Sequence, residues 1–197
     1  MTARAFANAP GSVRITGGQI KGRKLAVPEG AGVRPTTDRA REALFNVLTN
    51  RFRKPGGESV LAGARVLDAF AGTGALGIEA WSRGAAFVSF VEHSSAHFSV
   101  LQANVRSAKL PAEAWDARRD RRGLDEPFDL IIADPPYEQG QGLLDALSAE
   151  RSLWHSETLL VWERPRTKGE EPALAGWDEV HQTPSGKTVF GFFRPAG

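Results

Sequence analysis

The stretch that decides the fold is Val66-Leu67-Asp68-Ala69-Phe70-Ala71-Gly72-Thr73-Gly74-Ala75-Leu76-Gly77. It begins as a buried strand and continues as a helix, so it is a strand-to-helix connection. Its glycines Gly72, Gly74 and Gly77 satisfy the spacing G-x-G-x-x-G. Glycine at these positions lets the backbone turn tightly and lets a ligand approach without a Cβ atom in the way. The helix start also presents free N–H groups, which predicts a loop that binds a cofactor.

Two classes of cofactor fit such a loop. A dinucleotide would place its pyrophosphate at the helix N-terminus, and Glu92, at the end of the next expected strand, lies where an acid takes ribose hydroxyls. Asp68, however, ends the first strand, and its carboxylate would repel a pyrophosphate. The same carboxylate suits the positive amino group and sulfonium of S-adenosylmethionine, which we therefore favour. Asp116, at the end of the third expected strand, either accepts from an adenine amino group or is an ordinary acid in a surface turn.

A second stretch, Asp134-Pro135-Pro136-Tyr137, follows the apolar run Phe128–Ala133. Proline donates no ladder hydrogen bond and fixes its own backbone, so the strand ends in a stiff, non-helical corner. A planar group with an amino substituent can stack on Tyr137 and donate to the Asp134 carboxylate and the Pro135 carbonyl. This corner predicts a pocket for the edge of a nucleobase, with a plain loop that contains two prolines as the alternative.

The hydrophobic pattern around these stretches alternates between strands and helices. Such alternation indicates a parallel sheet with right-handed crossovers. We expect a flexible tail over residues 1–12, a basic hairpin and helix extension over 13–57, and the main domain over 58–197. The expected strands cover 13–16, 20–27, 65–69, 87–92, 113–116, 128–134, 158–163, 179–182 and 187–193, and the expected helices cover 38–53, 75–83, 94–109 and 142–150.

Composition narrows the class of protein. The 197 residues suffice for one α/β domain with a small appendage, and the chain contains no cysteine, hence neither disulfide nor thiolate metal site. Together with the lack of a signal-like segment, this fits the cytoplasm. The first 60 residues carry 11 bases and 4 acids, a net +7, whereas the remainder carries 14 bases and 19 acids, a net −5. A basic N-terminal third predicts contact with a polyanion, with a merely solvated basic surface as the alternative. We expect no metal site.

The motifs together resemble a known group. The run from Asp68 to Gly77, the acid Glu92 and the loop from Asp134 to Tyr137 resemble Rossmann-like methyltransferases that act on exocyclic amino groups. The segments 14–19, 22–25, 34–39 and 41–46 narrow this resemblance to the RsmD family, over about residues 13–193. The resemblance implies an α/β, Rossmann-like class I methyltransferase. Its seven-stranded, mostly parallel sheet would end in an antiparallel hairpin and carry a small N-terminal hairpin and helix extension.

The resemblance also implies an activity and a site. The activity is transfer of a methyl group from S-adenosylmethionine to the N2 amino group of a guanine in 16S ribosomal RNA, either naked or within an assembling small subunit, by a monomer that needs no metal. An adenine-N6 methyltransferase of DNA or RNA, a nicotinamide-dependent oxidoreductase and a non-catalytic RNA-binding module are the alternatives. The implied catalytic residues are Asp134, Pro135, Pro136 and Tyr137; the implied cofactor residues are Asp68, Phe70, Gly72, Gly74, Glu92, Asp116 and Ala117; the implied RNA-binding residues are Lys21, Arg23, Lys24, Arg34, Thr36 and Arg39.

Overall fold

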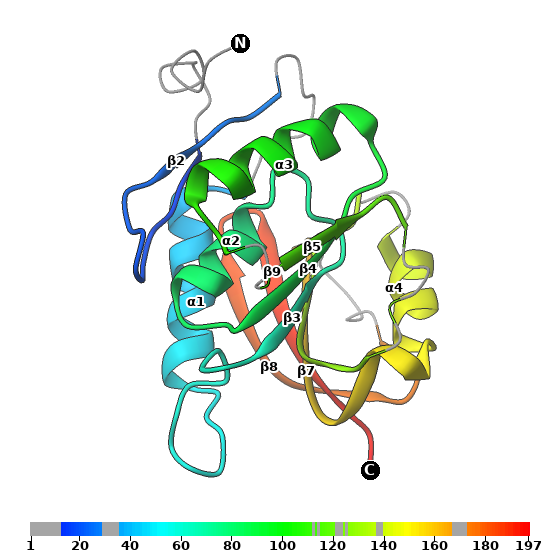
Figure 1. Cartoon of the computed structure of the whole chain (residues 1–197). Helices are drawn as coiled ribbons and strands as arrows, with labels where there is room; N and C mark the ends of the chain where they lie inside the picture. The colour runs from blue at the N-terminus through cyan, green and yellow to red at the C-terminus, as the bar shows by residue number, and fades with distance from the viewer. Residues whose placement is uncertain are drawn as a thin grey trace.

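A seven-stranded sheet with strand order β5-β4-β3-β6-β7-β9-β8 forms the centre of the computed structural model (Figure 1). The first five strands in this order run parallel, and β9 runs antiparallel to both β7 and β8. The expected fold class is therefore confirmed. The strands are β3 Arg65–Asp68, β4 Phe87–Val91, β5 Trp115–Arg118, β6 Phe128–Ala133, β7 Trp154–Pro165, β8 Trp177–Ser185 and β9 Thr188–Pro195. The structure describes residues 13–28, 36–111, 113, 115–120, 124, 126–136, 140–166 and 173–197.

The strand order reverses direction between β3 and β6. From β3 the chain moves outward through β4 to β5, and it then returns to place β6 on the other side of β3. In open parallel sheets, ligands bind outside the carboxyl ends of the strands at such a switch point. Asp68 is the last residue of β3 and Asp134 directly follows β6, so the two motifs singled out in the sequence meet at this edge.

Helices cover the two faces of the sheet unequally. Figure 1 shows α1, α2 and α3 gathered on one side and α4 alone on the other. The side chain of Thr37 caps α1 by accepting from the N–H of Ala40, and Ser94 caps α3 by accepting from the N–H of His97. Both caps use the short oxygen side chains that favour helix starts. The helices are α1 Asp38–Asn50, α2 Ala75–Ser82, α3 Ser95–Ala108 and α4 Gly140–Ser148, with a short 3₁₀ turn at Arg151–Leu153.

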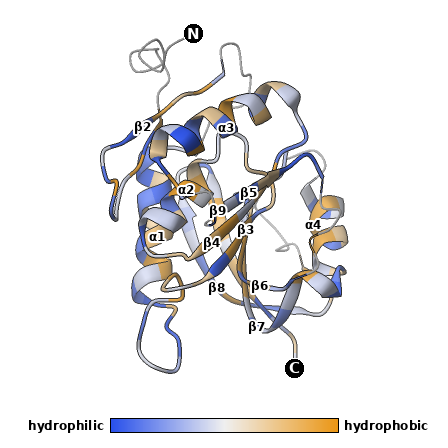
Figure 2. Cartoon of the chain, in the orientation of Figure 1, coloured by the Kyte–Doolittle hydropathy of each residue, from blue (hydrophilic) through white to orange (hydrophobic). Residues whose placement is uncertain are grey.

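Alternating side chains of the strands supply two separate hydrophobic cores. On β3, Val66 faces the core beneath α1, α2 and α3, whereas Leu67 faces the core shared with α4. On β6, Leu130 and Ile132 belong to the first core and Ile131 to the second. Buried on both faces, these strands read as continuous apolar runs, and they appear as a hydrophobic centre between helices with polar outer faces (Figure 2).

The N-terminal hairpin is much shorter than the sequence predicts. Its strands are β1 Val13–Arg14 and β2 Lys24–Leu25, with two residues each, and turns occupy most of the segment between them. The expected strand over 20–27 is thus wrong outside residues 24 and 25. The turn docks on the end of α2, where the Ser82 hydroxyl donates to the Gly17 carbonyl at 2.6 Å and accepts from the Ile20 N–H at 3.1 Å. Docking, and not strand pairing, therefore shapes this segment.

A buried group of charges fastens the hairpin to the helices. We name Thr16, Asp38, Arg41, Glu79 and Arg83 the anchor cluster. The Glu79 carboxylate accepts from the Thr16 N–H at 2.7 Å and from the Arg83 guanidinium at 2.8 Å, and it lies 3.7 Å from the Arg41 guanidinium. Arg41 also pairs with Asp38 at 2.7 Å. The side chains of Arg41 and Glu79 are fully buried, so Arg41, counted above among the bases for a polyanion, is an internal structural charge.

The other differences from prediction are shifts of element ends. Strand β5 begins two residues later than expected, at Trp115, which places Asp116 inside the strand and not at its end. Strand β7 runs over 12 residues, twice the expected length, because β9 pairs with its second half. Within the described residues no helix is long and apolar enough to cross a membrane.

Candidate active site

Asp68 supports the glycine loop from below. Its carboxylate is 1% exposed and accepts from the N–H of Gly77 at 2.9 Å. The pKa of Asp68 is raised to about 7, chiefly by burial and to a smaller extent by the charge of Glu92, while the Gly77 N–H acts in the opposite direction. One carboxylate oxygen is thus committed to the loop that a ligand would contact.

The three positions of the loop favour glycine for different structural reasons. A Cβ atom on Gly77 would lie 2.3 Å from the Phe90 ring, and one on Gly74 would lie 2.4 Å from Leu101, so both are needed for packing of the helix on the sheet. Gly72 has φ +53°, yet a Cβ there would meet nothing within 4 Å. The loop is therefore open at Gly72, which is the position where a cofactor can approach the backbone.

Glu92 directly follows β4 and contacts the glycine loop through its carboxylate. Its carboxylate accepts from the Gly72 N–H at 2.8 Å and from the Ser94 N–H at 2.6 Å. A carboxylate offers about four acceptor positions, so it can still accept from hydroxyl groups. Glu92 thus joins the open glycine to the start of α3.

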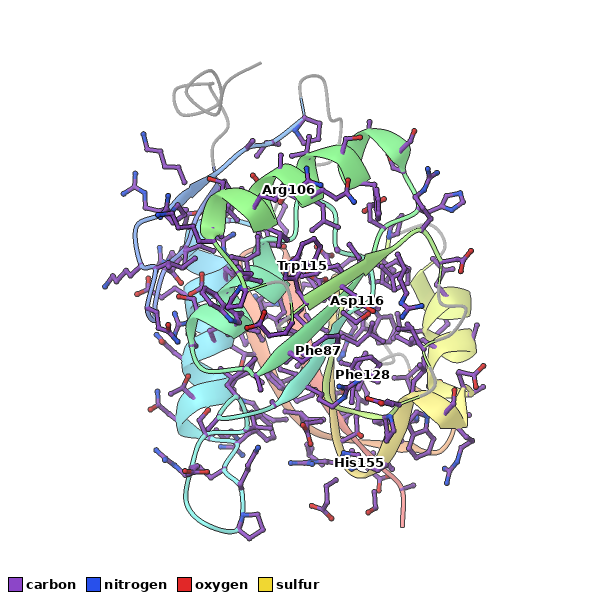
Figure 3. All side chains as sticks on the ribbon, viewed as in Figure 1. Phe87, Arg106, Trp115, Asp116, Phe128 and His155 are labelled. Atoms are coloured by element: carbon purple, nitrogen blue, oxygen red, sulfur yellow. The ribbon has the colours of Figure 1, made fainter. Side chains whose placement is uncertain are left out.

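Asp116 and Ala117 lie on β5, beside Trp115 (Figure 3). One oxygen of Asp116 pairs with the Arg118 guanidinium at 2.9 Å, and the other, Oδ1, is buried without a hydrogen-bond partner. A buried acceptor without a donor is costly, and an amino group would satisfy it. Phe70, half-buried, packs on the core shared with α4.

The acid after β6 meets two residues that are distant in the sequence. The Thr36 hydroxyl lies 3.2 Å from Asp134 Oδ2 and 2.8 Å from Glu163 Oε2. Asp134 is half-buried and Glu163 on β7 is 6% exposed. The pKa of Asp134 is raised to about 8, first by burial and then by the charge of Glu163, while the hydrogen bond with Thr36 acts in the opposite direction. The pKa of Glu163 is likewise raised by burial.

Only part of the remaining predicted base pocket lies within the residues that the structure describes. Pro135 is buried and Pro136 is exposed, so the two prolines face in different directions at the corner. Tyr137 lies outside the described residues, as does Arg34 among the predicted RNA contacts. Thr36, another predicted RNA contact, instead lies between the carboxyl groups of Asp134 and Glu163. The remaining predicted RNA contacts are exposed: Lys21, Arg23, Lys24 and Arg39.

Glu163 belongs to this site but was not among the residues predicted from the sequence. The signal that could have found it is an acid near the end of the apolar strand Thr158–Trp162, since burying a charge within such a run requires a reason. Its exact neighbours, Asp134 and Thr36, could be recognised only in the fold. No group of three His, Asp or Glu side chains is arranged to hold a metal ion among the residues that the structure describes.

Comparisons with known proteins agree with this arrangement. A family model described as Conserved hypothetical protein 95 matches residues 13–194. Ribosomal RNA small subunit methyltransferase D of Escherichia coli is 32% identical over 193 residues, which cover 93% of this chain and 90% of that protein. The chain belongs to the RsmD family. A Bacillus subtilis relative, the putative rRNA methyltransferase YlbH, is 34% identical and covers 78% of this chain and 83% of its own.

The RsmD relationship extends to structure. The putative methyltransferase yhhF from Escherichia coli superposes with a TM-score of 0.76 at 32% identity, over 94% of this chain and 99% of that one. The superposition therefore covers nearly the whole chain and is not confined to the cofactor loop.

Proposed function

We propose that this RsmD-family chain transfers a methyl group from S-adenosylmethionine to the N2 amino group of a guanine in 16S ribosomal RNA. The observation that carries the proposal is the switch point: Asp68, the last residue of β3, lies close enough to Asp134, which follows β6, for its charge to act on Asp134. A cofactor loop and an acceptor for an amino group thus share one edge of the sheet. The relatives, which are named as ribosomal RNA methyltransferases, suggest the class of substrate.

The described residues fit S-adenosylmethionine. Gly72 leaves room for its approach, Glu92 retains acceptor capacity for ribose hydroxyls, and the unpartnered Oδ1 of Asp116 can accept from the adenine amino group. Asp68 places negative charge beneath the loop, on the side of a positive amino group. Phe70, Gly74 and Ala117 complete the proposed cofactor surface.

The chain's own residues would perform three tasks. Bound S-adenosylmethionine supplies an electrophilic methyl group on a positively charged sulfur. The carboxylate of Asp134 and the carbonyl of Pro135 accept the N–H groups of the target amine, which favours a more pyramidal and more nucleophilic nitrogen in the transition state. The corner holds that nitrogen in line with the methyl group. On its place in the sequence, Tyr137 would stack on the base, a contact worth about 1–3 kcal/mol.

The target must be accessible to such a corner. A paired base cannot reach it, so the nucleotide is flipped out or unpaired when it binds. The exposed bases Lys21, Arg23, Lys24 and Arg39 would hold the surrounding RNA, together with Arg34. We further propose that the protein acts as a monomer in the cytoplasm, on an assembling small subunit.

Methyl transfer to RNA is the direct test. Purified protein is given labelled S-adenosylmethionine and 16S RNA that lacks the modification, either naked or within small subunits, and the product nucleoside is identified by mass spectrometry. We expect N2-methylguanosine at one position. Asp134→Ala should lower the turnover at least about 100-fold and leave the affinity for S-adenosylhomocysteine within a few fold.

Glu157 is exposed and lies near the start of β7, whereas Glu163 lies near the end of the same strand. Glu157→Gln therefore serves as the control and should keep full turnover. Near-normal turnover of Asp134→Ala would exclude the proposed role of that residue. Methylation at adenine N6 would overturn the choice of base and support the alternative of an adenine methyltransferase.

A further inference from the structure

The three residues Thr36, Asp134 and Glu163 form a chain of hydrogen bonds that the proposed reaction does not yet use. They come from three separate parts of the sequence: the segment before α1, the corner after β6, and β7. The register pairs Ala133 with Trp162, so the next residues, Asp134 and Glu163, lie at the same level of the sheet. The Thr36 hydroxyl is within hydrogen-bonding distance of both carboxyl groups, at 3.2 and 2.8 Å.

The single hydroxyl proton of Thr36 cannot serve two ionised carboxylates at once, so this geometry favours a state in which one of the two carboxyl groups is protonated. A threonine hydroxyl carries one proton and can donate one full hydrogen bond, although its oxygen can accept another. If Thr36 donates to Glu163 at the shorter distance, the contact with Asp134 is complete only when the Asp134 carboxyl group donates to the Thr36 oxygen. Two nearby buried acids that share a proton in this way avoid placing two negative charges side by side.

Thr36 is itself held in place from the other side. Its carbonyl accepts from the fully buried Arg41 guanidinium at 3.0 Å, so the anchor cluster fixes the residue that bridges the two acids. On the side of β9, a side-chain hydrogen bond from Thr188 acts on Glu163. Both ends of the bridge are therefore fixed by groups that have no contact with Asp134 of their own.

We propose that Glu163 is a positioning residue for methyl transfer: through the Thr36 hydroxyl it orients the Asp134 carboxyl group and shares one proton with it. This inference rests on the function proposed above. With Oδ2 of Asp134 held toward Thr36, Oδ1 is the oxygen that faces the target amine. Glu163 then sets the proton content of the acceptor without touching the base.

The shared proton has a consequence for the reaction. As the lone pair of the N2 nitrogen forms the new C–N bond, the C–S bond breaks and its electron pair stays on the sulfur. The methylated nitrogen then carries a positive charge and releases one proton to Asp134 or to water. An Asp134 carboxyl group that already holds the shared proton can neither accept the amine's hydrogen bond fully nor take up the released proton. The reactive form is therefore the one in which the pair has lost its proton.

The charges around Asp134 agree with this assignment. Among the described residues, those whose charges act on it are Glu163 from β7 and Asp68 from β3, and both are acids. Arg164, the neighbour of Glu163 in the sequence, pairs with Glu179 on β8 at 3.0 Å. The charges of Glu163 and Asp68 therefore favour retention of a proton on Asp134.

The pH dependence of kcat/KM on a short RNA substrate tests the inference. This quantity reports the ionisation of the free enzyme. We expect its rising limb near neutral to mildly alkaline pH, far above the range of an ordinary carboxyl group. Glu163→Gln keeps the shape of the side chain and removes its charge, so the limb should move to lower pH. Thr36→Val removes the oxygen that accepts from the protonated Asp134 carboxyl group, so the limb should also move to lower pH, and Thr36→Ser should restore it.

These two shifts separate positioning from mere structural support. A structural role would lower the rate of Glu163→Gln at every pH, whereas we expect the variant to reach a several-fold larger share of its maximal rate than the wild type at mildly acid pH. Glu157→Gln, which removes an exposed charge from the same strand, should leave the limb in place. An unchanged limb in Glu163→Gln, or a limb that moves to higher pH in Thr36→Val, would overturn the inference.

A second measurement does not depend on activity. Carbon-13 labelling of the aspartate and glutamate carboxyl groups allows their titration to be followed by NMR in the free protein, with Asp134→Asn and Glu163→Gln for assignment. We expect the two groups to titrate together in the wild type and the midpoint of Asp134 to fall in Glu163→Gln. If the protein methylates no RNA, the proposed function fails; independent titration of the two groups, with an Asp134 midpoint that is the same in Glu163→Gln, is the outcome that would refute proton sharing.

Discussion

The molecule contains two buried polar sites that obey opposite rules. In the anchor cluster, each buried charge has a partner of opposite sign, as Glu79 has in Arg41 and Arg83. In the acid site at the carboxyl edge, Asp68, Asp134 and Glu163 lie near one another, and the interactions that act on Asp134 include the charges of the other two acids. One site is built from attraction and the other from repulsion that the fold tolerates.

The difference indicates which site serves stability and which serves chemistry. A paired buried network holds elements together, and breaking it leaves an uncompensated charge. Like charges that are buried together raise one another's pKa and reduce stability, so they persist where a function needs them. The two sites are linked through Thr36, whose carbonyl bonds to Arg41 and whose hydroxyl bonds to the acids. The stable site thus positions the reactive one.

The largest expected effect comes from breaking the anchor cluster. Glu79→Gln keeps the volume of the side chain but removes the counter-charge of Arg83 and one of the two counter-charges of the buried Arg41, which keeps Asp38. We expect the free energy of unfolding to fall by about 3–5 kcal/mol, measured by urea denaturation. Glu157→Gln, an exposed glutamate, should change it by less than about 0.5 kcal/mol. A loss of similar size in both variants would contradict the role of the cluster.

A smaller loss is expected from the cofactor loop. Gly77→Ala places a Cβ atom 2.3 Å from Phe90 and 2.8 Å from Val88. Such overpacking costs about 1–3 kcal/mol, again by urea denaturation. Gly72→Ala meets no atom within 4 Å but requires an alanine at φ +53°, and it should act mainly on the affinity for S-adenosylhomocysteine. Equal cofactor affinity in Gly72→Ala and the wild type would show that this face of the loop does not meet the ligand.

The acid site should respond in the opposite sense, by gaining stability. Asp134→Asn removes one of the like charges, and we expect a gain of about 0.5–2 kcal/mol in the free energy of unfolding at pH 8 together with loss of methyl transfer. The sign follows from the pKa of Asp134, which is raised on folding from 3.8 to about 8. The folded state binds more protons, so stability falls as the pH rises from about 4 to about 8. This fall should be less steep in Asp134→Asn, and thermal unfolding across this pH range measures it.

The smallest effect is expected from the exposed bases of the hairpin. Replacing Lys21, Arg23 and Lys24 by alanine should weaken binding to unpaired RNA. It should also reduce the slope of log K against log salt by about 0.7 for each lost phosphate contact. Fluorescence anisotropy at several salt concentrations measures both. Arg51→Ala, which removes an exposed base at the far end of α1, serves as the control, and a slope that falls equally in that variant would assign the effect to overall charge.

The sequence was informative where the pattern of side chains is local. The loop from Asp68 to Gly77 was predicted correctly as a connection between a strand and a helix, because it depends on residues within a few positions of one another. The length of the strands in the N-terminal hairpin was overestimated, because the alternation of side chains there reflects docking on Ser82 and Glu79. The start of β5 was misplaced by two residues because its strand is short and polar.

By itself, the sequence determined the class of fold and the two motifs at its switch point, because periodicity and turn chemistry are properties of short segments. It also determined the family, through motifs spread over nearly the whole chain. Only the tertiary structure decided which charges are partners. In the fold, Arg41 is a buried charge paired with Glu79. Thr36 bridges Asp134 and Glu163, which are some thirty positions apart in the sequence. Burial and proximity set the behaviour of an ionisable group, and both arise only when distant segments pack.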